Sequence, residues 1–301
     1  MRSPKSRREF FGSDGSPLDL QPGTGNRADM SNFLLVDISN TFTKIAIARG
    51  GKIGRIHRLP TKKLKARDVV AVIGSAKLHG AVAASVVPDK NREIEGAYQW
   101  PICWIGPDIE LGVGIDYPSP SGIGADRLAN AAGCVAHYGA PAVVVDFGTA
   151  VTFDIISQSG NYIGGVIAPG LNAMTEYLHD RTALLPLITL REPRGVVGRS
   201  TREAMISGAV HGYRGLVREI LQQITHEAFG GKRPRVIATG GDASLIAAGV
   251  PLFTDVDPTL TLRGLLVAAE LNPGLLSGGG SAGSTRRPPT DGKRRGRRWA
   301  K

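Results

Sequence analysis

The segment Val143–Ala150 reads VVVDFGTA, and the segment Leu34–Thr41 reads LLVDISNT. Each is an apolar run that ends in an aspartate, followed by a turn of small residues and then by more residues that favour strands. In both segments a threonine follows the aspartate by three or four positions. Each segment therefore predicts a β-hairpin with a carboxylate at the end of a buried strand.

Such a hairpin has a functional and a purely structural interpretation. Turn amides and hydroxyls hold phosphate oxygens, while an aspartate holds a cation that neutralises the phosphate charge. An aspartate before a turn also bonds its own backbone, which is ordinary turn chemistry. Because the pattern occurs twice in one chain, we favour the functional interpretation, in which two lobes bind one nucleotide between them, as in a phosphotransferase.

The remaining elements repeat one order along the chain. Strands are expected at residues 34–37, 44–48, 80–87, 142–146, 151–156, 161–167 and 236–238. Helices are expected at residues 67–78, 124–138, 171–181, 201–228 and 262–270, and loop with short strand pieces at residues 88–123. The order of hairpin, β/α unit and helix occurs twice. It predicts an α/β fold of two similar lobes with a cleft between them.

Composition divides the chain into two lobes and two tails. We expect lobes at residues 32–140 and 141–273, a disordered N-terminal extension at residues 1–31 and a disordered basic tail at residues 274–301. The tail carries eight Lys or Arg and one Asp, and the extension carries five Lys or Arg and four Asp or Glu. Of the net charge of +11, the lobes therefore carry 11 − 7 − 1 = +3. Met30, directly before the first strand, is a candidate for the true first residue.

Charge and residue usage exclude several classes of protein. A charge of +3 on the lobes does not favour a nucleic-acid partner. The two cysteines have neither a pairing pattern nor metal spacing, which indicates a reduced, cytoplasmic protein. The six histidines have no metal-ligand spacing, so no zinc site is expected. The chain has no run of eighteen apolar residues and the extension has no apolar signal core, so we expect neither a membrane span nor a secretory signal.

Five motifs together resemble the type III pantothenate kinases, a family of the actin-like ATPase superfamily that also includes acetate and sugar kinases. They are Asp37 with Asn40-Thr41, Gly124-Ala125-Asp126-Arg127, Asp146-Phe147-Gly148-Thr149-Ala150, Gly164-Gly165 with Pro169-Gly170, and Thr239-Gly240-Gly241. The resemblance covers residues 33–273. It implies two actin-like, ribonuclease H-like lobes around a nucleotide cleft. It also implies ATP-dependent phosphorylation of pantothenate to 4′-phosphopantothenate, the first step of coenzyme A biosynthesis.

The resemblance implies a nucleotide site at the two hairpins. The residues that would surround the ATP phosphates are Asp37, Ile38, Ser39, Asn40, Thr41, Phe42, Thr43 and Lys44, with Mg²⁺ beside Asp37 and a further contact from Thr149. Asp146 matches the family position that binds a monovalent cation, K⁺ or NH₄⁺. The family usually has glycine where this chain has Ser39, and serine lacks the easy access of glycine to positive φ.

The resemblance places pantothenate beside the helix expected at residues 124–138. Asp126 matches the general base that accepts the proton of the attacking hydroxyl, although an aspartate at a helix start also serves as an N-cap. Arg127 would pair with the substrate carboxylate or with the transferred phosphate. The other substrate contacts that the resemblance implies are Tyr117, Gly124, Ala125 and Thr201.

Members of the family are homodimers whose pantothenate pocket is shared at the subunit interface. We expect the helix at residues 201–228 to form part of that interface, although apolar helix stripes usually face a core. The apolar residues of this stripe are Met205, Ile206, Val210, Leu216, Val217 and Ile220.

Two other functions stay open. One is a non-catalytic regulator on the same scaffold, which Ser39 favours and the intact Asp37, Asp126 and Asp146 disfavour. The other is a kinase of another small hydroxy acid or sugar, because acceptor specificity depends on pocket shape more than on motifs.

Overall fold

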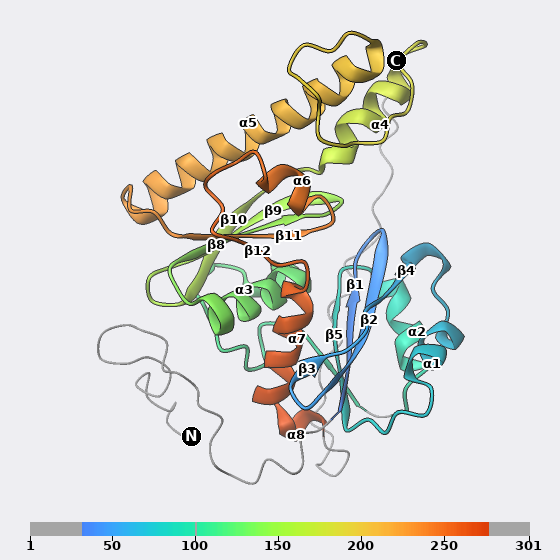
Figure 1. Cartoon of the computed structure of the whole chain (residues 1–301). Helices are drawn as coiled ribbons and strands as arrows, with labels where there is room; N and C mark the ends of the chain where they lie inside the picture. Colours follow the sequence, from blue (N-terminus) through green and yellow to red (C-terminus); the bar gives the residue numbers. More distant parts are fainter. Residues whose placement is uncertain (1–31, 100, 277–301) are drawn as a thin grey trace, which may run out of the picture.

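The computed structural model describes residues 32–99 and 101–276, which form two sheets with helices on and between them (Figure 1). The first sheet contains β1 (Phe33–Ile38), β2 (Phe42–Arg49), β3 (Lys52–Ile53), β4 (His57–Pro60), β5 (Gly80–Ser85) and β6 (Ile102–Trp104). The second sheet contains β7 (Gly114–Ile115), β8 (Ala142–Phe147), β9 (Ala150–Ile156), β10 (Asn161–Pro169), β11 (Arg235–Gly240) and β12 (Asp255–Val256). The helices are α1 (Ala66–Ile73), α2 (Asn91–Glu95), α3 (Ala125–Tyr138), α4 (Leu171–Arg181), α5 (Thr201–Phe229), α6 (Ala243–Ala247), α7 (Leu260–Leu271) and α8 (Pro273–Leu276).

The two sheets share one strand order. The first runs β3-β2-β1-β5-β6 and the second runs β10-β9-β8-β11-β12. In each sheet the central strand pairs antiparallel with the strand that follows it in a hairpin, and parallel with a strand that comes later. The prediction of an α/β fold with two similar lobes is confirmed. The lobe boundary expected between residues 140 and 141 stays a prediction. Strand β7 comes before this boundary in the sequence, yet it pairs with β10 of the second sheet.

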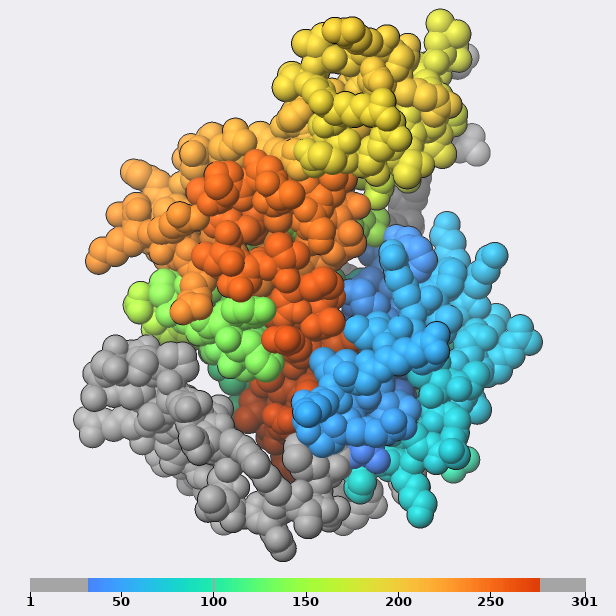
Figure 2. Space-filling view, in the orientation of Figure 1, coloured from blue at the N-terminus to red at the C-terminus, as the bar shows by residue number. Residues whose placement is uncertain are grey.

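Alternation of side chains along the central strands builds the layers. Leu34 of β1 packs on the outer face with α1 and α2, whereas Leu35 faces inward. In β8, Val143 packs outward with α5 and α6, whereas Val144 faces inward. The inward residues of both sheets join the apolar residues of α3 and α7 in one cluster, so these two helices lie between the sheets. Figure 2 shows the blue residues of the first sheet beside green and orange residues from later in the chain, with a yellow part that includes the start of α5 projecting beyond both.

Helices α3 and α7 approach each other closely because a glycine stands on each. A Cβ at Gly133 of α3 would lie 2.7 Å from the carbonyl oxygen of Leu260. A Cβ at Gly264 of α7 would lie only 1.8 Å from the carbonyl oxygen of Ala129. The two backbones are therefore in contact, which keeps the layer between the sheets thin.

Most expected elements are present, with differences where a local feature decides the end. The helix expected at residues 67–78 ends at Ile73, because Gly74 at φ 54° leaves the helical region. Within the expected loop, α2 forms a short helix. The sequence predicts that the disordered basic tail begins at residue 274, but residues 274–276 belong to α8, where Leu276 is buried against Gly80.

The rest of both expected tails, with Met30, lies outside the described residues. Within residues 32–99 and 101–276, the structure contains no helix whose length and apolar character would suit a membrane crossing.

We predict that Gly264→Ala lowers the stability of the fold by about 3 kcal/mol or more, because the added methyl group overlaps the backbone of α3. Thermal unfolding followed by circular dichroism should show a melting temperature that is about 6–12 °C lower. The control is Gly212→Ala in α5, where nothing lies within 4 Å of the new Cβ. Alanine favours a helix over glycine by up to about 1 kcal/mol, so this variant should melt at the same temperature or higher. Equal melting of the two variants would contradict the close packing of α3 on α7.

Candidate active site

The turns of the two hairpins meet between the lobes. The hydroxyl groups of Thr41, after β1, and Thr149, after β8, are 2.8 Å apart and share a hydrogen bond. The N–H of Gly170 donates to the carbonyl of Thr149 over 3.1 Å, and a Cβ at Gly170 would lie 2.5 Å from that oxygen. Glycine is therefore required at position 170, where α4 starts. The segments Leu34–Thr41 and Val143–Ala150 form one site.

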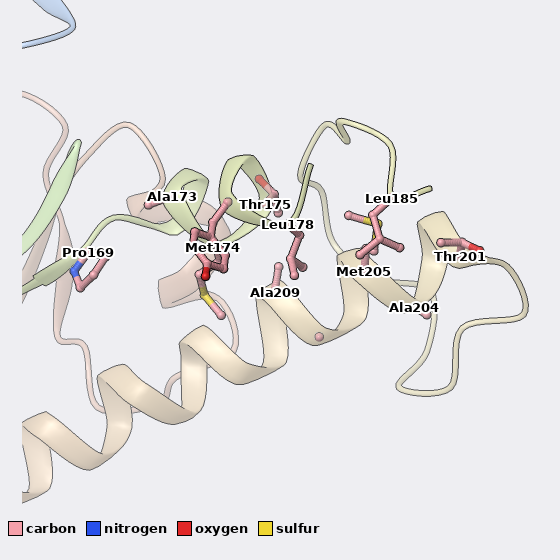
Figure 3. A pocket seen from close by; sticks show the side chains of 12 residues that line it. Pro169, Ala173, Met174, Thr175, Leu178, Leu185, Thr201, Ala204, Met205 and Ala209 are labelled. Atoms are coloured by element: carbon pink, nitrogen blue, oxygen red, sulfur yellow. The ribbon is translucent and has the colours of Figure 1, made fainter. Parts of the chain in front are cut away.

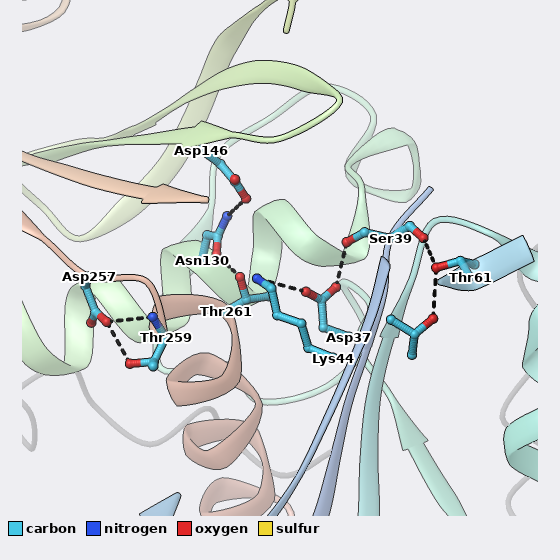
Figure 4. A network of polar contacts seen from close by, with 10 residues as sticks. Asp37, Ser39, Lys44, Thr61, Asn130, Asp146, Asp257, Thr259 and Thr261 are labelled. Atoms are coloured by element: carbon cyan, nitrogen blue, oxygen red, sulfur yellow. Dashed lines mark hydrogen bonds and ion pairs between the residues drawn. The ribbon is translucent and has the colours of Figure 1, made fainter. Parts of the chain in front are cut away.

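Asp37 lies at the end of β1 and is 2% exposed. Its Oδ1 accepts a hydrogen bond from the Ser39 hydroxyl (2.9 Å), and its Oδ2 is 3.6 Å from the ammonium of Lys44, its partner in the β1–β2 register (Figure 4). Burial raises the pKa of Asp37 most, Lys44 and Ser39 lower it, and Asp146 raises it further. The carboxylate is thus partly compensated and lies close enough to Asp146 to feel its charge.

Ser39 fits the first turn without strain. No residue other than glycine has a positive φ within residues 32–99 and 101–276, so the turn does not need glycine at this position. The Thr61 hydroxyl donates to the carbonyl of Ser39 (2.7 Å) and also lies 3.0 Å from the Thr43 hydroxyl. Thr61 therefore fixes the turn from the side of the first lobe.

Asp146 ends β8 and is held by a chain of polar side chains that reaches α7. The amide of Asn130 donates to Asp146 Oδ2 (2.9 Å), and the Thr261 hydroxyl donates to the amide oxygen of Asn130 (2.8 Å). Burial raises the pKa of Asp146, while Asn130 and then Lys44 lower it. A Cβ at Gly240, which has φ 93°, would lie 2.5 Å from Asp146 Oδ1, so the Thr239-Gly240-Gly241 motif leaves room for this carboxylate.

Asp126 stands in the first turn of α3, but it is not the N-cap. The cap position belongs to Gly124, whose missing Cβ leaves space for Asp126 Oδ1, 2.7 Å from where that Cβ would be. Oδ1 accepts the backbone N–H of Arg127 (2.8 Å). Burial, then the charges of Asp146 and Asp37, raise the pKa of Asp126 to about 6. Asp37, Asp126 and Asp146 therefore form one cluster of interacting carboxylates. Asp126 is a candidate general base in this cluster because its pKa is near neutral.

A second polar group lies beside Asp126. Arg127 Nε donates to Asp154 Oδ1 (2.6 Å), and the Tyr162 hydroxyl donates to the same oxygen (3.2 Å). The Tyr117 ring stands edge-on to the Tyr162 ring, with centroids 6.0 Å apart. Glycine at position 165 leaves room for the Arg127 guanidinium, because a Cβ there would clash with Nη2. Tyr117 and Arg127, predicted as substrate contacts, are thus brought together.

Other expected residues are placed differently. Ile38 is fully buried and reaches the turn only through its backbone, whereas Asn40 is exposed. The Phe42 ring lies under the Arg58 guanidinium, 3.6 Å from its centroid. Thr201 begins α5 at the projecting end of the second lobe, away from α3 (Figure 1).

Thr201 lines a cavity of about 740 Å³ between α4 and α5, whose walls are mainly apolar (Figure 3). The structure of one chain therefore does not bring Thr201 to Asp126.

Some site residues are not apparent from the sequence motifs. Asn130 follows Asp126 by four positions, and this helical spacing was a usable signal that both face one side of α3. Asp154 occupies an inward position of β9 and is the only charged residue of this strand, which also marks it. Thr61 and Thr261 carry no local signal, because only the tertiary packing brings them to the turn and to Asn130.

The described residues contain no group of three His, Cys, Asp or Glu side chains placed to hold a metal ion unaided. Mg²⁺ at Asp37 would therefore take its other ligands from water and phosphate, as Mg²⁺ commonly does. Asp37 fits this use, since it is a buried carboxylate with a raised pKa and a single lysine as its ion-pair partner.

Comparison with known proteins shows which sequences this chain resembles. A family model described as type III pantothenate kinase matches residues 33–223. A type III pantothenate kinase of Akkermansia muciniphila is 51% identical over 241 residues, covering 80% of this chain and 99% of that protein. One of Methylacidiphilum infernorum is 42% identical over 238 residues, covering 79% of this chain and 88% of that protein.

Among solved structures, one titled a conserved putative Baf family transcriptional activator from Campylobacter jejuni is similar in fold. The TM-score is 0.55 at 20% identity, over 80% of this chain and 99% of that chain.

We predict that Asp126→Asn stabilises the fold at pH 8. Folding raises the pKa of Asp126 from 3.8 to about 6, so the native state binds the proton more tightly than the unfolded chain. The ionised group therefore costs stability above pH 6, and this cost fades as the pH falls toward 4. Asparagine removes the charge and keeps an oxygen for the Arg127 N–H. Thermal melts should show a gain of about 1–3 kcal/mol at pH 8 that shrinks steadily toward pH 4.5. If the variant were less stable than the wild type at pH 8, the repulsion of Asp126 by Asp37 and Asp146 would be refuted.

Proposed function

We propose that Asp126 is the general base in this chain, which belongs to the type III pantothenate kinase family. The protein transfers a phosphoryl group from ATP to pantothenate and thereby makes 4′-phosphopantothenate in coenzyme A biosynthesis. The observation that supports Asp126 is its position in the cluster: it is the carboxylate beside both the turn carboxylates and Arg127. An ionised Asp126 accepts the proton of the pantothenate hydroxyl as that oxygen attacks the γ-phosphate.

The phosphate-binding role falls to the two turns. Phosphoryl transfer needs mainly positioning and neutralisation of charge. The turn at residues 38–41 offers backbone amides and hydroxyls, Lys44 offers an ammonium, and Thr149 faces Thr41 from the second lobe. Asp37 would hold Mg²⁺, which when bound neutralises phosphate charge. Lys44 partly compensates the charge of Asp37.

Asp146 is proposed to hold the monovalent cation, K⁺ or NH₄⁺. A buried hydroxyl supports this assignment: Thr239 Oγ1 has no hydrogen-bond partner within residues 32–99 and 101–276. Thr239 is the partner of Asp146 in the parallel register of β11 and β8, so the two side chains point to the same face. A carboxylate with a raised pKa beside an oxygen without a partner is a suitable donor set for a weakly bound cation.

The substrate role falls to the residues around Arg127. Tyr117, Arg127, Gly124 and Ala125 line the start of α3 and its neighbour β10. The non-catalytic regulator, which Ser39 favours in the sequence, loses that support because Ser39 is unstrained and hydrogen-bonded to Asp37. Two free, buried cysteines and the use of ATP support a cytoplasmic location.

A homodimer is proposed because Thr201 is far from Asp126 within one chain. The apolar stripe expected at the interface needs correction: Ile206, Val210 and Val217 are buried in the chain's own core. Exposed apolar residues instead gather at the cavity between α4 and α5, where Met174, Tyr177 and Leu178 form part of its lining. The segment that joins α4 to α5 exposes four more: Leu184, Leu187, Val196 and Val197. A surface of this kind favours a protein partner, and a second copy would bring its Thr201 to the shared pocket.

We predict that Asp126→Asn lowers kcat by about 100-fold or more, the usual span for a lost general base. ATP binding should persist, because it depends on Asp37, Lys44 and Thr149. The measurement is ADP release coupled to NADH oxidation, with pantothenate, Mg²⁺ and K⁺ present, and with nucleotide affinity determined by calorimetry.

Asp89→Asn is the matched control, because Asp89 is an exposed aspartate outside the site. It should leave kcat unchanged. A kcat for Asp126→Asn within a few-fold of the wild type would refute the base. In the same assay, turnover of the wild type should fall when Na⁺ replaces K⁺, as the cation assigned to Asp146 requires.

We predict that Leu178→Glu disrupts the dimer and abolishes most of the activity, because it places a charge in the apolar surface between α4 and α5. Light scattering should give twice the chain mass for the wild type and a lower mass for the variant. Val70→Glu, on an exposed apolar position of α1 that is 51% accessible, should change neither. A wild-type monomer with full activity would exclude a shared pocket.

A further inference from the structure

Asp154 of β9 is a fully buried carboxylate next to the site. Its residue is 0% exposed, and Oδ1 accepts hydrogen bonds from Arg127 Nε (2.6 Å) and from the Tyr162 hydroxyl (3.2 Å). The Thr152 hydroxyl approaches Oδ2 at 3.4 Å. A buried carboxylate is costly unless it is paired and hydrogen-bonded. These contacts therefore explain how Asp154 is tolerated, but they leave open why it is there.

The ion pair occupies only one nitrogen of Arg127. Among residues 32–99 and 101–276, no acceptor forms a hydrogen bond with Nη1 or Nη2, and the Arg127 side chain is 14% exposed. Gly165 leaves space beside Nη2, because a Cβ there would lie 2.4 Å away. The two outer nitrogens thus remain available for a ligand, in the planar arrangement that binds a carboxylate through both oxygens.

The contacts of Arg127 show on which side of Asp126 it lies. Its Nε bonds Asp154 of β9, and its guanidinium carbon lies 5.7 Å from the centroid of the Tyr162 ring of β10. Within residues 32–99 and 101–276, no hydrogen bond or ion pair joins its side chain to Asp37, to Asp146 or to the two hairpin turns. The guanidinium therefore lies on the β9–β10 side of Asp126, where the end of the substrate opposite to its reacting hydroxyl is expected.

We propose that Asp154 is a positioning residue that, together with Tyr162, holds Arg127 in the orientation that binds the carboxylate of pantothenate. The proposal rests on the substrate role proposed for Arg127 and selects the carboxylate over the transferred phosphate as its partner. An arginine side chain loses rotamer entropy when a ligand fixes it in one orientation. Because Asp154 restrains it beforehand, less of this cost falls on substrate binding. The arrangement selects acceptors that carry a carboxylate over neutral molecules with the same hydroxyl.

The test compares pantothenate with pantothenyl alcohol, in which a neutral hydroxymethyl group replaces the carboxylate. Asp154→Asn should raise KM for pantothenate by about 10- to 100-fold, the value of one or two charge-assisted hydrogen bonds. KM for the alcohol and KM for ATP should stay within about twofold, so the preference for pantothenate is lost. Tyr162→Phe removes one of the bonds to Asp154 and should lose part of the same preference, which keeps the test available if Asp154→Asn folds poorly.

Asp257→Asn is the matched control. Asp257 is also a buried carboxylate that pairs with an arginine Nε (Arg263, 3.3 Å) and a tyrosine hydroxyl (Tyr138, 3.2 Å), but it lies outside the site. Its replacement should lower the melting temperature and leave both KM values unchanged. Equal increases of KM for both acceptors in Asp154→Asn would show a structural role only and overturn the proposal.

The variant Arg127→Met distinguishes the substrate role of Arg127 from the positioning role of Asp154. If it keeps the preference for pantothenate, the substrate role of Arg127 itself is wrong. If it loses the preference while Asp154→Asn and Tyr162→Phe retain it, the role of Arg127 stands and the positioning role of Asp154 is wrong.

Discussion

The backbone contact between α3 and α7 is the constraint on which the site depends. Because glycine stands at positions 133 and 264, the helical layer between the two sheets is thin. Both sheets pack on this layer, so the ends of β1 and β8 come close enough for Thr41 to bond Thr149. The same helix α3 carries Asp126 in its first turn and Asn130 one turn later. Its position therefore sets both the width of the cleft and the place of the proposed base.

Electrostatic repulsion is the cost of this arrangement. Asp37, Asp126 and Asp146 are buried to different degrees, and the charges of Asp37 and Asp146 raise the pKa of Asp126. Lys44, Ser39 and Asn130 offset part of the repulsion by ion pairing and hydrogen bonding. The repulsion that is not offset favours the binding of cations together with ATP. The site thus gives up some stability of the fold where activity requires it. Burial and neighbouring charge, not residue type, distinguish the proposed base from the proposed cation ligands.

Support from a second layer of side chains is a recurring feature of the site. Thr61 holds the first phosphate turn through the carbonyl of Ser39, and Thr261 holds Asp146 through Asn130. Asp154 holds Arg127 in the same manner. Each functional group thus has a partner that restricts its rotamers before a ligand arrives, which is how a binding site is made ready at low entropic cost.

The sequence by itself determined the hairpins, the ends of α3 and α4, and the motifs that identify the family. These depend on local physics: alternation in strands, glycine and proline at helix ends, and aspartate before a turn. Only the tertiary structure decided that Asp126 lies inside α3 instead of capping it, that Ile206 and Val210 face the core, and that Asp154 pairs with Arg127. Those outcomes depend on contacts between residues far apart in the chain and on the burial that shifts a pKa, and neither is encoded in any single segment.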